Sequence, residues 1–285
     1  MHRRIYCVAL IAAVALVAAC APTAPPDRDW KVVPESITVH DSEDGDGGDE
    51  PYVIQLGFRS KLGVEGSTST SLRSQCRAGK LPATNAVPSG TTYLVPAGSA
   101  DVTFAGVKNL DLVDLAAGTA PFEVLGTFSF VMERDGLTAG CAVTDALNNS
   151  LRPLLDDALA LLIANSPTPP TEDELIDLLV DNLGSFVAAA GNLIGAVLEG
   201  LGNPDDVIGV AAQIHLPTGG ALTELVHTAF ALGGLFSPGL EDGFIPIEGL
   251  PSEIQIRVGT LSPSAVDFRF TTSIADYGFR SRVTR

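Results

Sequence analysis

The amino-acid sequence predicts an α+β fold: an antiparallel β-sandwich or barrel that is interrupted by an inserted helical block. Segments near both ends of the chain alternate apolar and polar residues with period two, which is typical of half-buried strands. Between them, from about 144 to 204, apolar residues recur at helical spacing. The 29 glycines and the charged content of only 18% fit a β-rich exported protein with many turns.

The first half of the chain is expected to be mostly β. Residues 30–39 favour a strand that Pro34 interrupts, because proline cannot donate a ladder hydrogen bond. The alternation of Tyr52, Ile54 and Phe58 with smaller or polar neighbours predicts a second strand. Residues 92–95, 102–107 and 122–134 read as further strands, whereas the Ser/Thr/Gly-rich stretch 63–74 resembles a loop.

The middle of the chain predicts two helices. Ser150 can cap the first one, which is expected to end before the break at 166–170. Thr171 and Glu174 form a capping box for a second helix that runs to about 201, before Gly202 and Pro204. Residues 207–232 are ambiguous between strands and a short helix at 222–232, and alternation after residue 254 indicates a return to β-structure.

The first twenty residues have the features of an export signal. Arg3 and Arg4 precede a short apolar run, which is too short for a comfortable membrane span. Small residues then lead to Cys20. This segment resembles the lipobox of bacterial lipoproteins, and the resemblance covers only the leader. It implies cleavage before Cys20 and a lipid on its thiol; an ordinary cleaved signal whose site happens to end in cysteine is the alternative.

The expected organisation follows from that leader. Residues 1–19 form the signal peptide, 20–29 a lipidated Pro-rich tether, and 30–285 one α+β domain with the helical insertion; the alternative is a helical block that folds by itself. Without Arg3 and Arg4, 15 basic residues face 34 acidic ones, a net charge of −19. Such a charge repels nucleic acid, so no nucleic-acid partner is expected.

Cysteine usage agrees with export. Cys76 and Cys141 are an even pair in an oxidising compartment, and we expect them to form a disulfide. A metal or catalytic role is the rival, but neither residue lies in a Cys-x-x-Cys motif or beside a histidine. His215 and His227 are twelve residues apart without a zinc motif, and each is expected to be a core or surface histidine.

The acidic segment 40–50 is the densest cluster of chemically active groups. Calcium prefers oxygen ligands, and a glycine-rich turn can fold carboxylates inward. The expected ligands are Asp41, Asp44, Asp46, Asp49 and Glu50. The spacing fails the EF-hand pattern, and a solvated hairpin tip is the alternative. Asp49-Glu50-Pro51-Tyr52 resembles segments of uncharacterised secreted bacterial β-domains, which imply no function.

The residues 183–198 contain no charge and include Gly191 and Gly195 on a small-residue face. Such a helix is expected to be buried in the core, and the alternative is a segment that binds lipid or inserts into a membrane.

The leading functional expectation is a non-enzymatic cell-envelope lipoprotein, anchored by lipid on the outer side of the cytoplasmic membrane as a binding or structural module. The Gly/Ala-rich composition points to an actinobacterial host. A lipid-binding or membrane-active protein that uses helix 171–201 is the first alternative, and a hydrolase with an unrecognised site is the second. No catalytic residue is assigned, because no nucleophile elbow or nucleotide-binding motif occurs.

Overall fold

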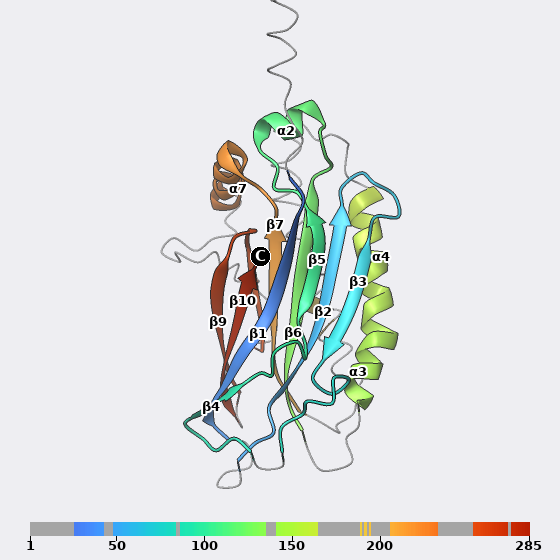
Figure 1. The fold of residues 1–285 in the computed structure, drawn as a ribbon. Helices are drawn as coiled ribbons and strands as arrows, with labels where there is room; N and C mark the ends of the chain where they lie inside the picture. The colour runs from blue at the N-terminus through green and yellow to red at the C-terminus, as the bar shows by residue number, and fades with distance from the viewer. Residues whose placement is uncertain are drawn as a thin grey trace, which may run out of the picture.

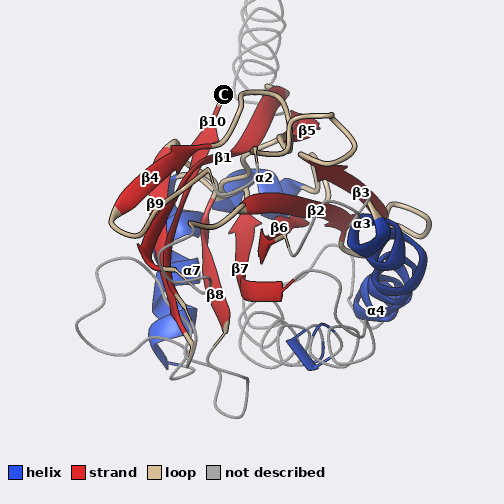
Figure 2. Cartoon of the chain, turned by 90° about the horizontal axis from the view of Figure 1, so that it is seen from below, coloured by secondary structure: helices blue, strands red, loops and turns tan. Residues whose placement is uncertain are grey.

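Two β-sheets lie face to face, and helices cover the face of one sheet that points away from the other sheet (Figures 1 and 2). The computed structural model describes residues 26–42, 48–83, 86–134, 141–164, 189, 191–192, 194, 206–232, 253–272 and 275–285. The α+β sandwich expected from the alternation of the terminal segments is confirmed.

The first sheet, called the outer sheet here, has the strand order β4-β1-β10-β9, and β5 also pairs with β1. Its strands are β1 (Arg28–Asp41), β4 (Thr91–Leu94), β5 (Val102–Val107), β9 (Ser264–Thr271) and β10 (Asp276–Thr284). The register of β1 shifts between Pro34 and Ser36, as expected from the proline. β5 pairs with β1 before this irregularity and β4 pairs with it afterwards, so one long strand holds two short neighbours.

The second sheet, called the inner sheet here, has the order β3-β2-β6-β7-β8. Its strands are β2 (Tyr52–Lys61), β3 (Ser69–Ser74), β6 (Glu123–Glu133), β7 (Asp206–Leu216) and β8 (Ile254–Thr260). β7 and β8 are parallel, in contrast to the antiparallel pattern elsewhere. The reason is the helix α7 (Gly220–Leu232) between them, because a parallel pair needs a long crossover.

Helices pack on the far side of the inner sheet and bury its apolar face. The helical segment after β6 consists of α3 (Ala142–Ala146), a π-helical turn η2 (Leu147–Leu151) and α4 (Arg152–Ala164). The expectation that Ser150 caps the first helix is therefore wrong, because the segment already begins at Ala142 and Ser150 lies within η2. Leu151, Leu155 and Leu159 join the same hydrophobic cluster as Ile54 and Phe128 of the sheet. Ile194 is 1% exposed and belongs to this cluster, which supports the core placement of that part of the insertion. Among the described residues, no helix is both long and apolar enough to cross a membrane.

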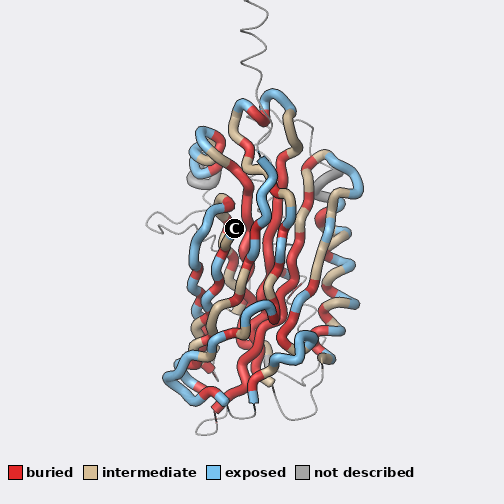
Figure 3. Tube along the Cα trace, viewed as in Figure 1, coloured by how far each residue is buried: buried red, intermediate tan, exposed pale blue. Residues whose placement is uncertain are grey.

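The space between the two sheets holds two separate hydrophobic clusters. Val131 on β6 and Phe279 on β10 belong to the first, and Leu125 and Val283 on the same strands belong to the second. Buried polar side chains occupy the inward positions between them. This polar belt comprises Gln55, Thr127, Ser129, Gln213 and Ser281, all 0% exposed. Figure 3 shows the buried backbone that runs through both sheets.

Much of the polar belt lacks hydrogen-bond partners within the described part of the chain. The side-chain amide of Gln55 donates to Ser129 at 3.2 Å. The hydroxyl of Thr127 and both polar atoms of the Gln213 side chain have none. Unpaired buried polar groups cost free energy, so the belt weakens the packing between the sheets.

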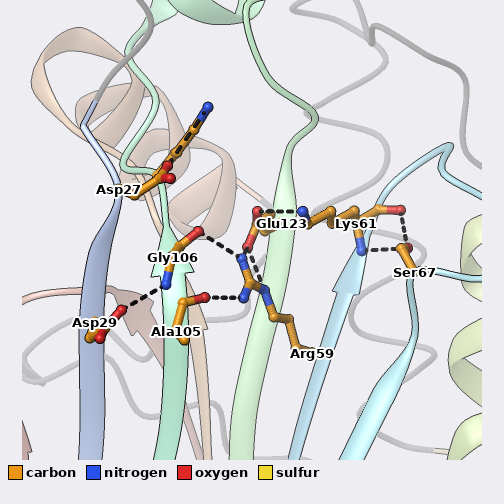
Figure 4. A network of polar contacts seen from close by, with 9 residues as sticks. Asp27, Asp29, Arg59, Lys61, Ser67, Ala105, Gly106 and Glu123 are labelled. Carbon is orange, nitrogen blue, oxygen red and sulfur yellow. Dashed lines mark hydrogen bonds and ion pairs between the residues drawn. The ribbon is translucent and has the colours of Figure 1, made fainter.

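Side chains rather than strand pairing join the two sheets along the β2–β5 side. Arg59 on β2 donates to the carbonyls of Ala105 and Gly106 on β5, at 2.5 and 3.2 Å (Figure 4). Its guanidinium also pairs with Glu123 at 2.7 Å, and Lys61 lies 3.8 Å from the same carboxylate. Because Arg59 and Glu123 are 15% and 4% exposed, solvent screens this pair only weakly.

On the opposite side, β8 blocks the free edge of β9. Gln255 donates to the carbonyl of Arg269, and Arg257 donates to the carbonyl of Asp267 at 2.8 Å. Both carbonyls belong to an edge strand, which would otherwise offer a template for strand addition.

Two elements were not expected from the sequence. β3 lies in the Ser/Thr-rich stretch that resembles a loop, and it pairs with β2 over six residue pairs. The helix α2 (Leu112–Ala117) begins at a capping box in which the side chains of Asp111 and Asp114 bind each other's backbone N–H. The ambiguous segment 207–232 contains one strand and one helix, β7 and α7.

Thr127→Val should stabilise the protein by about 1 kcal/mol, because valine keeps the shape and removes an unpaired buried hydroxyl. Thr144→Val is the matched control. Thr144 is equally buried, but its hydroxyl lies 3.3 Å from that of Ser74, so its loss should destabilise the protein by a similar amount. Urea unfolding measures both, and equal destabilisation by the two variants would contradict the prediction.

His215 should make the protein less stable in acid. Burial lowers the pKa of this imidazole from 6.5 to about 4, and neither ring nitrogen has a partner among the described residues. Between these values the unfolded chain binds more protons, so stability is present above pH 6.5 and is lost as the pH falls towards 4. The loss between pH 7 and 5 amounts to about 2 kcal/mol.

Urea unfolding at pH 7 and pH 5 measures this loss. His215→Gln should abolish that part of the pH dependence, whereas His227→Gln, at an exposed position on α7, should leave it unchanged. A wild-type pH slope in the His215 variant would refute the assignment.

Candidate functional site

A polar hollow lies on the solvent face of the outer sheet. Its volume is about 420 Å³. Residues of four neighbouring strands line it: Ser36, Thr38, His40, Thr92, Asp267, Phe268, Arg269, Gly278, Phe279 and Arg280. The two phenylalanine side chains belong to the core beneath, so the outward groups are polar. We call this feature the Gly278 hollow.

The missing side chain of Gly278 creates the hollow. In the antiparallel register, Gly278 on β10 lies between Thr38 on β1 and Arg269 on β9. Two residues further along β10, Arg280 lies on the same face of the sheet, between Ser36 on β1 and Asp267 on β9. A Cβ at Gly278 would lie 3.1 Å from the imidazole Nε2 of His40, so a side chain here would crowd that ring and narrow the hollow.

Ion pairs hold the charged side chains around the hollow. Arg269 donates to both carboxylate oxygens of Asp276, at 3.0 and 2.6 Å. Arg280 bridges Asp267 and Glu35, at 3.2 and 3.3 Å. The hydrogen bond from Arg269 holds the pKa of Asp276 below its ordinary value, and the bond from Arg282 does the same for Glu35. The charges at the rim are therefore mutually neutralised.

Hydroxyl groups of β1 and β4 line the side of the hollow away from β9. The hydroxyls of Thr38 and Thr92 are 2.9 Å apart and bind each other. Among the described contacts, the hydroxyls of Ser36, Thr38 and Thr92 donate to no histidine and no carboxylate. The lining therefore offers hydrogen-bond donors and acceptors for binding, and it contains no activated nucleophile of the serine–histidine type.

The Gly278 hollow has almost no signature in the amino-acid sequence. The only local signal is a glycine at an outward position of the last strand, between Tyr277 and Phe279 and before Arg280. Which residues surround that glycine depends on pairing with β1, about 240 positions earlier, and this pairing has no local signature.

The acidic segment predicted to bind calcium is only partly described. Asp44 and Asp46 lie outside the described residues, and Asp41 is exposed at the end of β1. Asp49 and Glu50 are buried, at 0% and 4% exposure. Within the described ranges, no group of three or more acidic, histidine or cysteine residues is arranged to hold a metal ion. Calcium binding by this segment stays a prediction.

Asp49 has a structural environment that the sequence did not reveal. Ser42 donates its hydroxyl to one carboxylate oxygen at 2.5 Å, and Tyr277 donates its hydroxyl to the other. The Asp49 backbone also pairs with Val87. This carboxylate therefore ties the start of β2 to β10. Nearby, the backbone N–H of Glu50 donates to Oε1 of Glu133 at 3.4 Å, and this further buried carboxylate was not expected from the sequence.

Cys76 and Cys141 form a disulfide with a Cα–Cα distance of 5.6 Å, as predicted. This bond links the turn after β3 to the start of α3. His215 is a core residue and His227 is exposed, in agreement with the expected structural roles. Cys20 lies outside the described residues.

Comparisons of the chain with protein-family models, curated proteins and solved structures found no match.

Asp49→Asn should destabilise the protein even in the presence of a calcium chelator, by about 1–3 kcal/mol, because two hydroxyl donors lose a charged acceptor. Asp41→Asn, at an exposed position, should change stability in chelator by no more than about 0.5 kcal/mol. Urea unfolding in chelator measures both effects. Asp49→Asn with wild-type stability would show that the buried carboxylate has no structural role.

Thermal unfolding in millimolar calcium against chelator, at constant ionic strength, tests the calcium site itself. Calcium should raise the midpoint in the wild type, and Asp44→Asn combined with Asp46→Asn should remove the rise. An unchanged wild-type midpoint would leave the segment without a calcium site.

Proposed function

We propose that this chain is a cell-envelope lipoprotein whose folded part is a non-enzymatic binding module outside the cytoplasmic membrane. The observation that carries the binding role is the Gly278 hollow: donors and acceptors from four strands surround a position without a side chain. The guanidinium and carboxylate groups at its rim are paired with each other, which restricts their positions before a ligand arrives and lowers the entropic cost of binding.

The export signal and the disulfide support an extracytoplasmic location. Disulfides persist in oxidising compartments, and Cys76–Cys141 is formed in the structure. Cys20, which resembles the lipidated cysteine of a lipobox, precedes Arg28 at the start of β1 by only eight positions. A lipid on that thiol would hold the start of β1 close to the membrane.

The site would then lie at the far end of the molecule from its anchor. β1 runs from the end that carries α2 to the end that carries β4 (Figure 1). From Arg28 to Thr38, ten residues of strand span about 33 Å at 3.3 Å per residue. This separation would place the hollow away from the membrane surface, where a ligand in the cell envelope can reach it.

Cys20→Ala should abolish fatty-acid labelling and move the protein from the detergent phase to the aqueous phase. Cys7→Ala is the matched control, since this cysteine would leave with the signal peptide, and it should be labelled like the wild type. Metabolic labelling with a radioactive fatty acid, followed by phase partitioning, measures both properties. Continued labelling of the Cys20 variant would refute the lipoprotein assignment.

A further inference from the structure

We propose that the Gly278 hollow binds an uncharged saccharide, a segment of a neutral glycan of the cell envelope. This inference rests on the proposed binding function and assigns a ligand class to the same site. Three properties of the hollow support it: its size and shape, the alternation of donors and acceptors around it, and its charge balance.

The open space matches a single sugar ring. Thr38 and Arg269 flank Gly278 from the two adjacent strands, so two strand spacings, about 9.6 Å, separate their backbones. The volume of about 420 Å³ lies within the range of roughly 300–1,000 Å³ typical of small-molecule sites. Gly278 carries no side chain, and the imidazole of His40 lies beside it, so this ring borders the space in which a sugar ring would lie.

The groups around the hollow suit the hydroxyls of a sugar, each of which can donate and accept hydrogen bonds at the same time. On one side, the hydroxyls of Thr38 and Thr92 can do either. On the other side, Arg280 and Asp267 present a donor and an acceptor next to each other. One vicinal pair of sugar hydroxyls can therefore bind a guanidinium and a carboxylate together, without leaving either unpaired.

The charge balance disfavours ionic ligands. Each guanidinium at the rim is paired: Arg269 with Asp276, and Arg280 with Asp267 and Glu35. A phosphate or carboxylate ligand would have to displace those carboxylates, and the whole chain carries a formal charge of −17, which repels anions. A divalent cation would need acidic ligands free of arginine, and the described residues contain no suitable group of three.

The test is calorimetric titration of the full-length protein in detergent micelles. The probes are tetrasaccharides of mannose, galactose, arabinose and glucose, with tetragalacturonate as the anionic counterpart. We expect at least one neutral tetrasaccharide to bind and tetragalacturonate to bind at least tenfold more weakly. Failure of all neutral probes to bind, or tighter binding of the anionic probe, would overturn the saccharide assignment.

Gly278→Val tests the location of the site. The valine side chain would project into the hollow. The atoms nearest to its Cβ belong to the side chains of His40 and Thr38 rather than to the backbone, so the strand should keep its fold. The affinity for the neutral saccharide should fall at least tenfold. Gly259→Val, at a strand position on β8 where a Cβ meets nothing within 4 Å, should bind like the wild type.

Arg280→Gln provides a second variant at an exposed side chain, should Gly278→Val not fold. It should also weaken binding at least tenfold, because it removes the paired donor at the rim. Unchanged binding in a folded Gly278 or Arg280 variant would overturn the location. Saccharide binding and Cys20 lipidation are measured separately, so a lipidated protein that binds no glycan refutes only this inference.

Discussion

The burial of β6 on both faces is the constraint on which the rest of the structure depends. All eleven residues of this strand are buried, because it lies in the middle of a sheet that is itself the middle layer. Such a strand needs a packed layer on each of its two faces. The outer sheet supplies one, built from the two ends of the chain, and the helical insertion supplies the other. The helical cover follows β6 directly in sequence, whereas the outer sheet needs β9 and β10 from the end of the chain, so β6 is covered on both faces only when these last strands have docked.

The local patterns of the sequence predict the strands and helices that have one solvent-exposed face. The alternation in β9 and β10 is clear, since their outward residues face solvent. Prediction fails where burial does not follow a simple period. β7 is buried on both faces and therefore shows no alternation, which left residues 207–232 ambiguous. β3 is rich in Ser and Thr because it lies at a sheet edge, where Thr70 binds Asp156 and Arg152 of α4.

Long-range pairing limited the prediction of the sites. The disulfide could be predicted, because only two cysteines remain after the leader and the tether. The environment of Asp49 could not, since the hydroxyl that binds it belongs to Tyr277, 228 positions later. The same holds for the Gly278 hollow, whose residues come from β1, β4, β9 and β10. In sequence these are ordinary outward polar residues, and only the strand register brings them around one glycine.

The strand β10 connects the interior of the protein to its candidate binding site. Its inward residues Tyr277 and Phe279 pack in a hydrophobic cluster between the sheets, and its outward residues Gly278 and Arg280 line the hollow. Hydrogen bonds to β1 and β9 fix it on both sides, and Tyr277 binds the buried Asp49. The floor of the hollow is therefore held in place from beneath and from both edges. A binding site built on such a strand would be formed before its ligand arrives, so its affinity would depend on the rim groups rather than on folding of the platform.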